Sequence, residues 1–432
     1  MNTPISPQLS RRIEQAVEEL RAEQLDFLKR LVSFPSTLGN EGGAQDLMAD
    51  TFFGMELEVD RWQLDLDDLS DLAGFSPVDW GYADKANVVG IYRPPEHSGR
   101  SLILNGHIDV VPAGPEELWS SPPFVATERG GRLYGRGAGD MKGGIAAYVF
   151  ALKALGEAGL LPAADIYLQS VVEEECTGNG ALATLQRGYK ADAVLIPEPF
   201  PRQMLTAQVG VMWIEFSLTG KPTHVRAAGE GINAITLAQV VIDDLEELEQ
   251  AWNDDSVRHP AYHHLDHPLN FSVGKISGGE WPSSVPASCT FVLRISFFPG
   301  TPLVQVRQRI EARVEALNAR HPLLKSFPVT IRYYGFQAEG CTVDPQAEFM
   351  QLLDDTHRQL TGTGLAHLAT TATTDARFYA LYAGLPVTCY GPEASGIHGI
   401  DESLNLDSLH EVTVVLANLI ARWCGTVKRP GR

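Results

Sequence analysis

The sequence is poor in cysteine and contains no long hydrophobic run. Its five cysteines are scattered and lack CxxC spacing, so we expect reduced thiols rather than a disulfide framework. No apolar run approaches the length that a membrane span needs, and the charged, helix-periodic N-terminus does not resemble a signal peptide. These absences predict a soluble protein of the cytoplasm.

Positive charge is also scarce. The 432 residues include 34 Lys+Arg against 54 Asp+Glu, which gives a formal net charge of −20. Nucleic acids and anionic membrane surfaces attract basic patches, so this charge disfavours both as partners. The length predicts two or three domains with an ample core.

Strands and helices alternate through the first half of the chain. Strand-like apolar runs lie at 87–92, 101–105, 166–172 and 193–196, and helical runs at 8–34, 44–53, 145–155 and 180–186. This alternation predicts a largely parallel sheet with helices on both faces. The acidic, irregular segment 65–86 is interpreted as a surface insertion.

The pattern changes near residue 210. Strands are expected at 211–218, 271–276, 290–297 and 329–334, and long helices at 232–252 and 304–318. Two helices on a small antiparallel sheet form an α+β module that could fold alone. We interpret residues 211–334 as a domain inserted into an α/β domain, whose two parts are 1–210 and 335–432. The second part contributes helices at 348–361 and 409–423 and a strand at 385–390.

Polar side chains follow the predicted strands, where parallel sheets collect functional residues. His107 and Asp109 end the strand-like run that starts at Ser101, and residues two apart on an extended backbone point to the same side. A metal-bound histidine commonly donates its second ring N–H to a carboxylate. We therefore count Asp109 with the catalytic residues. Taken alone, each residue also has a structural interpretation, since an aspartate before a helix, such as Asp140, is usually an N-cap.

Five side chains together are predicted to form a metal-ligand set: His107, Asp140, Glu175, Glu198 and His398. Imidazole and carboxylate without thiolate suit Zn²⁺, Co²⁺ or Mn²⁺, and five ligands exceed what one catalytic zinc needs. If Asp140 bridges two ions, His107 and Glu198 complete the set of one ion. Glu175 and His398 complete the set of the other. Glu174 is then left as a base, although an acidic run such as 173–175 is more often a solvated surface.

Other motifs are incomplete. The glycines at 135, 137 and 139 lack a third at the dinucleotide-binding spacing, and Lys142 does not stand in a P-loop. No GxSxG nucleophile motif occurs. His259, His263 and His264 lie in a polar loop with two prolines and are interpreted as surface residues.

These motifs resemble the co-catalytic zinc metallopeptidase family that includes acetylornithine deacetylase, succinyl-diaminopimelate desuccinylase, aminoacylase and the glutamate carboxypeptidases. The matching segments follow the family's order over nearly the whole chain: Gly106–Pro112, Gly135–Lys142, Glu173–Glu175, Pro197–Pro199, Gly220–His224, Ile276–Gly279 and the loop at His398. The resemblance implies an inserted domain that acts as a lid and dimerises. It also implies amide hydrolysis by a metal-bridging hydroxide with Glu174 as the general base. The family often has Asp where Glu173 stands, a position that is not expected to bind metal.

The same resemblance implies roles for two residues of the inserted domain. His224 would reach the partner subunit's active site and stabilise an oxyanion there. Arg294 would bind a substrate carboxylate, for which its planar fork is suited. Without the family, the two would be interpreted as a turn histidine and a strand-face arginine. Arg377 is a further substrate-binding candidate, and an ion pair with Asp375 is the alternative.

The predicted function is a zinc-dependent amidohydrolase that removes an acyl group from an N-acyl amino acid, as acetylornithine deacetylase does. It would hold two divalent ions and act as a homodimer on small molecules. The alternatives are a succinyl-diaminopimelate desuccinylase, or a dipeptidase or carboxypeptidase of the same family. A noncatalytic binding protein on this scaffold would lack a ligand or the base, and neither is missing here.

Overall fold

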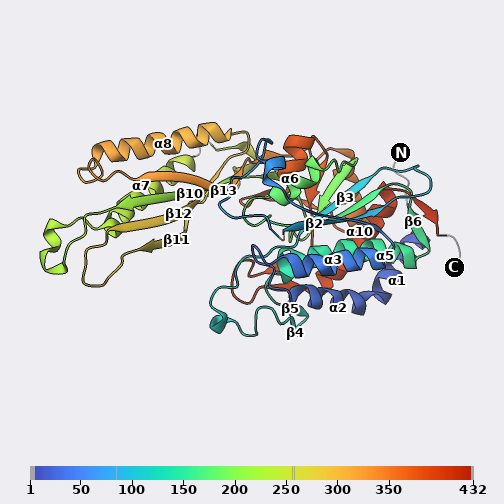
Figure 1. The fold of residues 1–432 in the computed structure, drawn as a ribbon. Helices are drawn as coiled ribbons and strands as arrows, with labels where there is room; N and C mark the ends of the chain where they lie inside the picture. The colour runs from blue at the N-terminus through green and yellow to red at the C-terminus, as the bar shows by residue number, and fades with distance from the viewer. Residues whose placement is uncertain (1–4, 84, 255, 257, 430–432) are drawn as a thin grey trace.

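The computed structural model describes residues 5–83, 85–254, 256 and 258–429 of the chain. A larger unit contains both ends of the chain, and a smaller unit projects from it (Figure 1). The larger unit is built around a six-stranded sheet, and the smaller one around a separate four-stranded sheet. The predicted fold class, an α/β domain interrupted by an inserted α+β domain, is therefore confirmed.

The central sheet of the larger unit has the strand order β1-β2-β7-β3-β8-β16. Its strands are β1 (Glu58–Gln63), β2 (Ala86–Tyr92), β3 (Leu102–His107), β7 (Ile166–Val171), β8 (Ala193–Ile196) and β16 (Val387–Cys389). β3 pairs in parallel with β7 and β8, and β16 pairs in parallel with β8. β1 and β2 add an antiparallel edge. The carboxyl ends of β3, β7, β8 and β16 therefore lie at the same end of the sheet.

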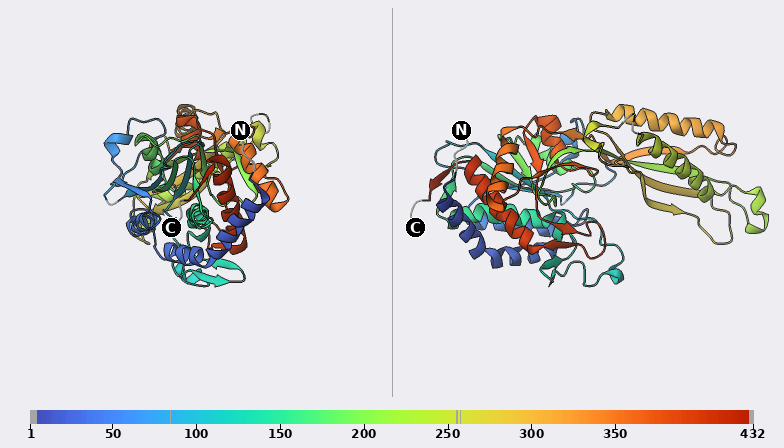
Figure 2. Two further views of the ribbon diagram at one scale, coloured as in Figure 1. Left: turned by 90° about the vertical axis from the view of Figure 1, so that its right-hand side faces the viewer. Right: turned by 180° about the vertical axis from the view of Figure 1, so that it is seen from behind.

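Helices cover both faces of this sheet. They are α1 (Pro7–Glu19), α2 (Arg21–Val32), α3 (Gly42–Gly54), α4 (Leu66–Leu69), α5 (Gly143–Glu157), α6 (Asn179–Gln186), α9 (Glu348–Thr361) and α10 (Leu406–Trp423). In Figure 1, α2, α3 and α5 lie below the sheet and α6 lies above it. α10 packs on α5 and α1, which joins the last helix of the chain to the first (Figure 2). No helix within the described ranges is both long enough and apolar enough to cross a membrane.

Short strands connect the parts of the larger unit. β9 (Gln203–Gln208) lies between β14 (Cys341–Thr342) and β15 (Ala366–Thr370). A second small sheet joins β17 (Ala394–Ser395), β18 (Ser403–Asn405), β5 (Arg132–Tyr134) and β4 (Thr127–Arg129), and a third joins β19 (Thr426–Lys428) with β6 (Leu160–Pro162). Gln208 pairs with Cys341, so the chain enters and leaves the smaller unit at neighbouring positions.

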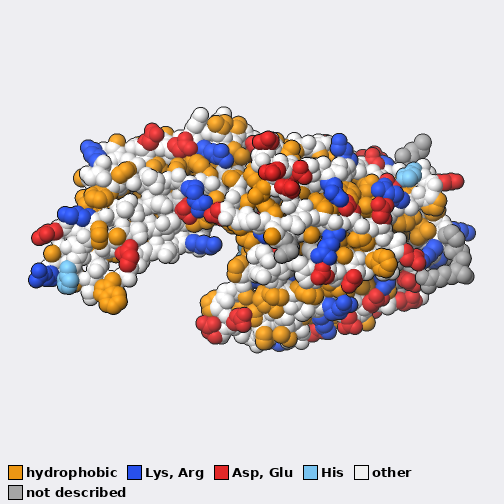
Figure 3. All heavy atoms as spheres, viewed as in Figure 1, with side chains coloured by type: hydrophobic (Ala, Val, Ile, Leu, Met, Phe, Trp, Pro, Cys, Tyr) orange, Lys and Arg blue, Asp and Glu red, His pale blue; other side chains and the backbone are white. Residues whose placement is uncertain are grey.

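The smaller unit, residues 210–338, is called the lid unit below. Its sheet has the order β11-β12-β10-β13, and all neighbouring strands are antiparallel. The elements are β10 (Gly210–Thr219), α7 (Ala234–Trp252), β11 (Ser272–Gly278), β12 (Ser288–Phe297), α8 (Leu303–Arg320) and β13 (Thr330–Ala338). The unit has its own hydrophobic core, in which the rings of Phe216 and Phe291 stack 4.8 Å apart. A wide hollow separates it from the larger unit on the face shown in Figure 3.

The interpretation of segment 65–86 as a surface insertion is wrong for three residues of its second half, whereas Asp79, Gly81 and Ala83 are exposed. Ser76, Tyr82 and Lys85 are buried. Tyr82 and Lys85 both donate hydrogen bonds to Glu173, and the Ser76 backbone N–H donates to Asn179. The acidic composition reflects only the residues of the segment itself. Burial of these three side chains depends on Glu173 and Asn179, which follow β7.

Candidate metal centre

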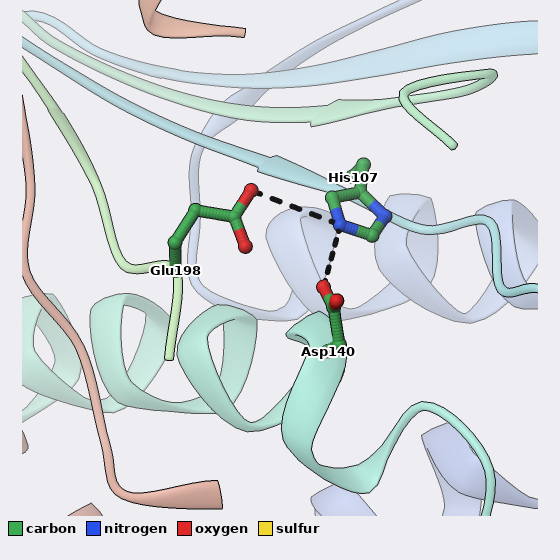
Figure 4. Close-up of side chains that lie close together, drawn as sticks. All are labelled: His107, Asp140 and Glu198. Atoms are coloured by element: carbon green, nitrogen blue, oxygen red, sulfur yellow. Dashed lines mark hydrogen bonds and ion pairs between the residues drawn. The ribbon is translucent and has the colours of Figure 1, made fainter. Parts of the chain in front are cut away.

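His107, at the carboxyl end of β3, lies at the centre of the first group of donors. Its Nε2 atom is 3.1 Å from Oδ1 of Asp140 and 3.8 Å from Oε1 of Glu198 (Figure 4). The ligand atoms of these three side chains all lie within 4.8 Å of one another. His107 and Glu198 are buried, and Asp140 is partly buried. One metal ion of ordinary coordination distance could therefore contact all three.

A second group lies beside the first and shares one residue with it. Nε2 of His398 is 3.0 Å from Oε2 of Glu175 and 3.5 Å from Oδ2 of Asp140. Asp140 thus offers Oδ1 to one group and Oδ2 to the other. The structure brings all five predicted ligands together in the predicted division, and their binding of ions stays a prediction.

The parallel sheet explains why residues so distant in sequence meet. His107 ends β3, Glu175 and Glu198 come shortly after β7 and β8, and His398 follows β16. These strands end at the same end of the sheet, so their following loops converge. Gly144 in the first turn of α5 packs directly against the loop that carries Glu198, since a Cβ on this residue would lie only 2.0 Å from the carbonyl oxygen of Pro197. Asp140, just before α5, therefore lies beside the other donors.

The carboxylate of Asp109 binds the backbone of the turn at residues 173–175 and not the ring of His107. Its two carboxylate oxygens accept the backbone N–H groups of Glu174 and Glu175, each at 3.1 Å. His107 Nδ1 instead donates to the backbone carbonyl of Asp109 at 2.9 Å and lies 3.6 Å from the carboxylate. This differs from the expected carboxylate partner, but it fixes the same tautomer, with Nε2 turned toward Asp140 and Glu198.

Glu174 lies beside the first group without belonging to either. Its Oε2 atom is 4.0 Å from His107 Nε2, and its Oε1 atom has no hydrogen-bond partner among the described residues. Burial raises the pKa of Glu174 well above its usual value, although the nearby His107 lowers it. The charges of Asp375 and Glu198 raise it further.

The charge of the site fits bound cations. Burial raises the pKa of Glu198 well above its usual value, and the charge of Asp140 adds to this rise. Burial also raises the pKa of Asp375, to about 7, and neither of its carboxylate oxygens has a hydrogen-bond partner among the described residues. So many buried carboxyl groups facing two imidazoles are costly unless positive charge balances them. Two divalent ions would supply that charge, and imidazole and carboxylate are suitable ligands.

The predicted lid residues lie outside both groups of donors. His224 is exposed and precedes the short helix Val225–Glu230, where its Nδ1 accepts the backbone N–H of Arg226 at 3.1 Å. Arg294 is partly buried on β12 and donates to the carbonyls of Asn270 and Thr371, each at 3.2 Å. Burial lowers the pKa of Arg294 to about 10. His263 and His264 are exposed, and His259 is partly buried.

Arg377 is completely buried and already has partners. Its guanidinium donates to the carbonyls of Thr374 at 3.2 Å and Thr177 at 2.7 Å, and it lies over the ring of Phe378 at 4.1 Å. These contacts account for the residue structurally. The alternative partner, Asp375, receives no hydrogen bond from any described residue, so it does not form the expected bonded ion pair.

Sequence reasoning missed an ion pair that braces the metal centre. The buried Arg136 donates to Oε2 of Glu402 at 2.5 Å and to the carbonyl of Gly399 at 3.0 Å. Oε1 of Glu402 accepts the backbone N–H groups of Gly139 and Asp140, at 2.9 and 3.1 Å. The pair therefore ties the loop of His398 to the turn that carries Asp140. Its sequence signals were slight: an arginine between glycines and a glutamate in the histidine loop.

Comparison with known proteins identifies the family. The model of the family described as Peptidase family M20/M25/M40 matches residues 103–422. This range covers most of the chain, so the protein belongs to that family. Its relatives hydrolyse amide bonds, and the chain is accordingly a hydrolase of linear amides that depends on divalent metal ions.

Several relatives align over almost their whole length. N-formyl-4-amino-5-aminomethyl-2-methylpyrimidine deformylase from Halalkalibacterium halodurans is 28% identical, with 94% of this chain and 96% of the relative covered. The deformylase of the same name from Bacillus subtilis is 28% identical, with 96% and 98% covered. Succinyl-diaminopimelate desuccinylase from Delftia acidovorans is 27% identical, with 88% and 92% covered.

Solved structures share the fold. The di-peptidase Dug1p from Saccharomyces cerevisiae superimposes with a TM-score of 0.77 at 16% identity, with 96% of this chain and 98% of that chain covered. Human carnosine dipeptidase 1 gives a TM-score of 0.74 at 16% identity, with 96% and 99% covered. At these identities the likeness concerns the fold alone.

Proposed function

We propose that the chain is a dinuclear zinc amidohydrolase that removes an acyl group from an N-acyl amino acid. The observation that carries this proposal is the sharing of Asp140 between two donor groups, with Glu174 beside them. Cobalt or manganese could occupy the same ligands, because neither donor type discriminates strongly among these ions. The desuccinylase among the relatives supports an acyl amino acid as substrate.

The residues of the chain have distinct roles in the proposed reaction. Bound divalent ions would supply Lewis acidity toward the substrate carbonyl and lower the pKa of the attacking water. Glu174 takes a proton from that water and returns it to the leaving amine nitrogen. Asp109 keeps Glu174 in place through the two backbone N–H groups that it accepts. His224 of a partner subunit donates a hydrogen bond to the oxygen on which negative charge develops.

A deformylase is the second candidate. Two relatives that cover nearly all of this chain bear that name. A formyl group is the smallest acyl group, and both reactions break an amide bond with the same residues. Arg294 separates the two candidates in part, because an N-acyl amino acid has a carboxylate that a guanidinium can bind, whereas the formylated aminomethylpyrimidine has none.

A substrate panel tests the proposal. After zinc or cobalt loading, kcat/KM is measured for N-acetyl-ornithine, N-succinyl-diaminopimelate, N-formyl-4-amino-5-aminomethyl-2-methylpyrimidine and dipeptides. We expect the highest values for an N-acyl amino acid, and a chelator should abolish activity until metal is restored. A preference for the formylated pyrimidine would establish the second candidate. Activity confined to dipeptides would contradict both.

We also propose a homodimer that forms through the lid unit. β11 is the outer strand of its sheet and is almost wholly exposed. Ile276 on this strand and Trp281 just after it are 56% and 69% exposed. An exposed edge strand is a template for pairing, and the same edge on a second copy can pair with it about a twofold axis. Such a dimer would give His224 a partner site to enter.

Charge placed on this edge should separate the subunits. The double substitution Ile276→Lys with Trp281→Lys is expected to give monomers in sedimentation velocity, because lysine blocks edge pairing. Without the partner's His224, kcat should fall by about 10²-fold or more. Val304→Lys is the matched control, since Val304 is 59% exposed on α8 at the opposite side of the lid sheet (Figure 1). Monomers with full activity would contradict the proposal.

The proposed location is the cytoplasm, and the proposed partners are small molecules and a second copy of the chain. All five cysteines are free and buried, as suits a reducing compartment. The net charge of −20 disfavours nucleic acid and anionic membranes.

A further inference from the structure

A short piece of the larger unit connects the metal centre to the lid unit. It comprises residues 76–83 and Lys85, and it is called the strap below. The strap lies between β13 of the lid unit and the turn after β7 that carries Glu174 and Glu175. Neither the proposed reaction nor the family motifs give it a role.

At one end, the strap surrounds Glu173, which is completely buried. Oε1 of Glu173 accepts from the indole N–H of Trp80 at 2.8 Å and from Nζ of Lys85 at 2.5 Å. Oε2 accepts from the hydroxyls of Tyr82 at 2.7 Å and Thr177 at 3.0 Å. Three of these four donors come from the strap. Each carboxylate oxygen of Glu173 therefore accepts two hydrogen bonds, and Glu173 has a structural role rather than that of a metal ligand.

The backbone at Glu173 needs these hydrogen bonds. Its φ is +65°, a left-handed conformation that a glutamate rarely adopts without support. The Glu173 carbonyl also accepts the N–H groups of Thr177 and Gly178, at 3.0 and 2.7 Å, which closes the turn. Glu174 and Glu175 lie inside this turn. Any rotation of Glu173 would therefore move both of them.

At its other end, the strap is docked on β13. The carbonyl of Pro77 accepts the N–H of Gly335 at 2.7 Å, and Oγ of Ser76 accepts the N–H of Gln337 at 3.1 Å. Asp79 forms an ion pair with Arg332 at 3.0 Å. The donors that hold Glu173 are thus fixed to a second element and do not belong to a freely moving loop.

We propose that Glu173, held by Trp80, Tyr82 and Lys85 of the strap, is a positioning residue for the metal ligand Glu175 and the base Glu174. This inference rests on the proposed function, because it assigns the strap a role in that same site. Partners behind a metal ligand orient it, and their loss commonly weakens metal affinity by about 10–100-fold.

Three variants test the inference on the full-length protein. Trp80→Phe removes one donor from Glu173 and keeps an aromatic ring, and Lys85→Met removes the buried cation. Arg313→Met is the matched control, because Arg313 forms an ion pair with the buried Asp244 in the lid unit at 2.6 Å, and its hydrogen bonds among the described residues go to Asp244 and Glu247 rather than to the strap. Zinc binding is measured by isothermal titration, unfolding by thermal melting, and kcat and KM with the best substrate of the panel.

We expect wild type to bind two zinc ions, and both strap variants to bind one of them about 10–100-fold more weakly. At saturating zinc, kcat should fall while KM changes little, since Glu174 is displaced but substrate contacts remain. Arg313→Met should lower the melting temperature without changing zinc affinity. If Lys85→Met does not fold, Trp80→Phe still decides the question.

Two outcomes would count against the inference in different ways. Wild-type zinc affinity and kcat in Trp80→Phe, with two ions bound in wild type, would overturn the positioning role and leave the proposed function intact. Fewer than two zinc ions in wild type would contradict the proposed function itself, and the inference would fall with it.

Discussion

Glu174→Gln is expected to lower kcat by about 10²–10⁴-fold, the range typical of a lost general acid–base group. Glutamine has the size of glutamate but cannot accept the proton of the attacking water. Glu174 lies in neither donor group, so the variant should keep both metal ions. Steady-state kinetics and metal content measured on the same zinc-loaded sample test both parts of this expectation.

Glu175→Gln provides the comparison, because it changes the adjacent acid in the same turn. This variant should lose an ion as well as activity, since Glu175 belongs to the group of His398. The base and the ligand are then distinguished by metal content alone. Near-normal turnover in Glu174→Gln would remove that residue from the role of base.

Asp140→Asn should have the largest effect on metal binding. Asp140 is the residue common to both donor groups, and an asparagine offers only one oxygen and no charge. Both ions should therefore bind at least about 100-fold more weakly. Loss of a side chain that only orients a metal ligand already weakens binding by up to about 100-fold, and Asp140 is itself a predicted ligand. Zinc titration of the metal-free protein measures this loss, and activity should disappear with it.

A single-group variant shows whether the sharing matters. His398→Ala removes a residue that only one group uses and should reduce the zinc content from two ions to one. Asp140→Asn should weaken both ions in the same titration. If Asp140→Asn retained two tightly bound ions, the two groups would be independent and the bridging role would be wrong.

The sequence was sufficient to predict the fold because its strand and helix signals are local and repeated, and the family because its motifs follow one another in the family's order. Strand-like runs alternate with helical ones, which indicates a parallel sheet, and parallel strands present their ends together. The alternation therefore predicts His107 and Glu198 at the same end of the sheet. The structure places them there, with Oε1 of Glu198 3.8 Å from Nε2 of His107.

The contacts behind the metal centre could not be predicted in this way. Arg136 and Glu402 are 266 residues apart, and neither periodicity nor motif spacing connects them. Lys85 and Glu173 pair across 88 residues, and the acidic composition around Lys85 favoured an exposed segment. Buried ion pairs depend on tertiary packing, which brings together segments whose local patterns are independent.

The neighbouring entry and exit of the lid unit would allow its excision without breaking the rest of the chain. Gln208 and Cys341 already face each other on paired strands, so a tight turn could join them if residues 210–338 were excised. None of the five predicted metal ligands lies in the excised range. A chain shortened in this way would retain all five predicted ligands but lose His224, Arg294 and the strand β13 on which the strap is docked. Its zinc affinity would therefore measure how much the lid unit contributes to holding the ions as well as to recognising the substrate.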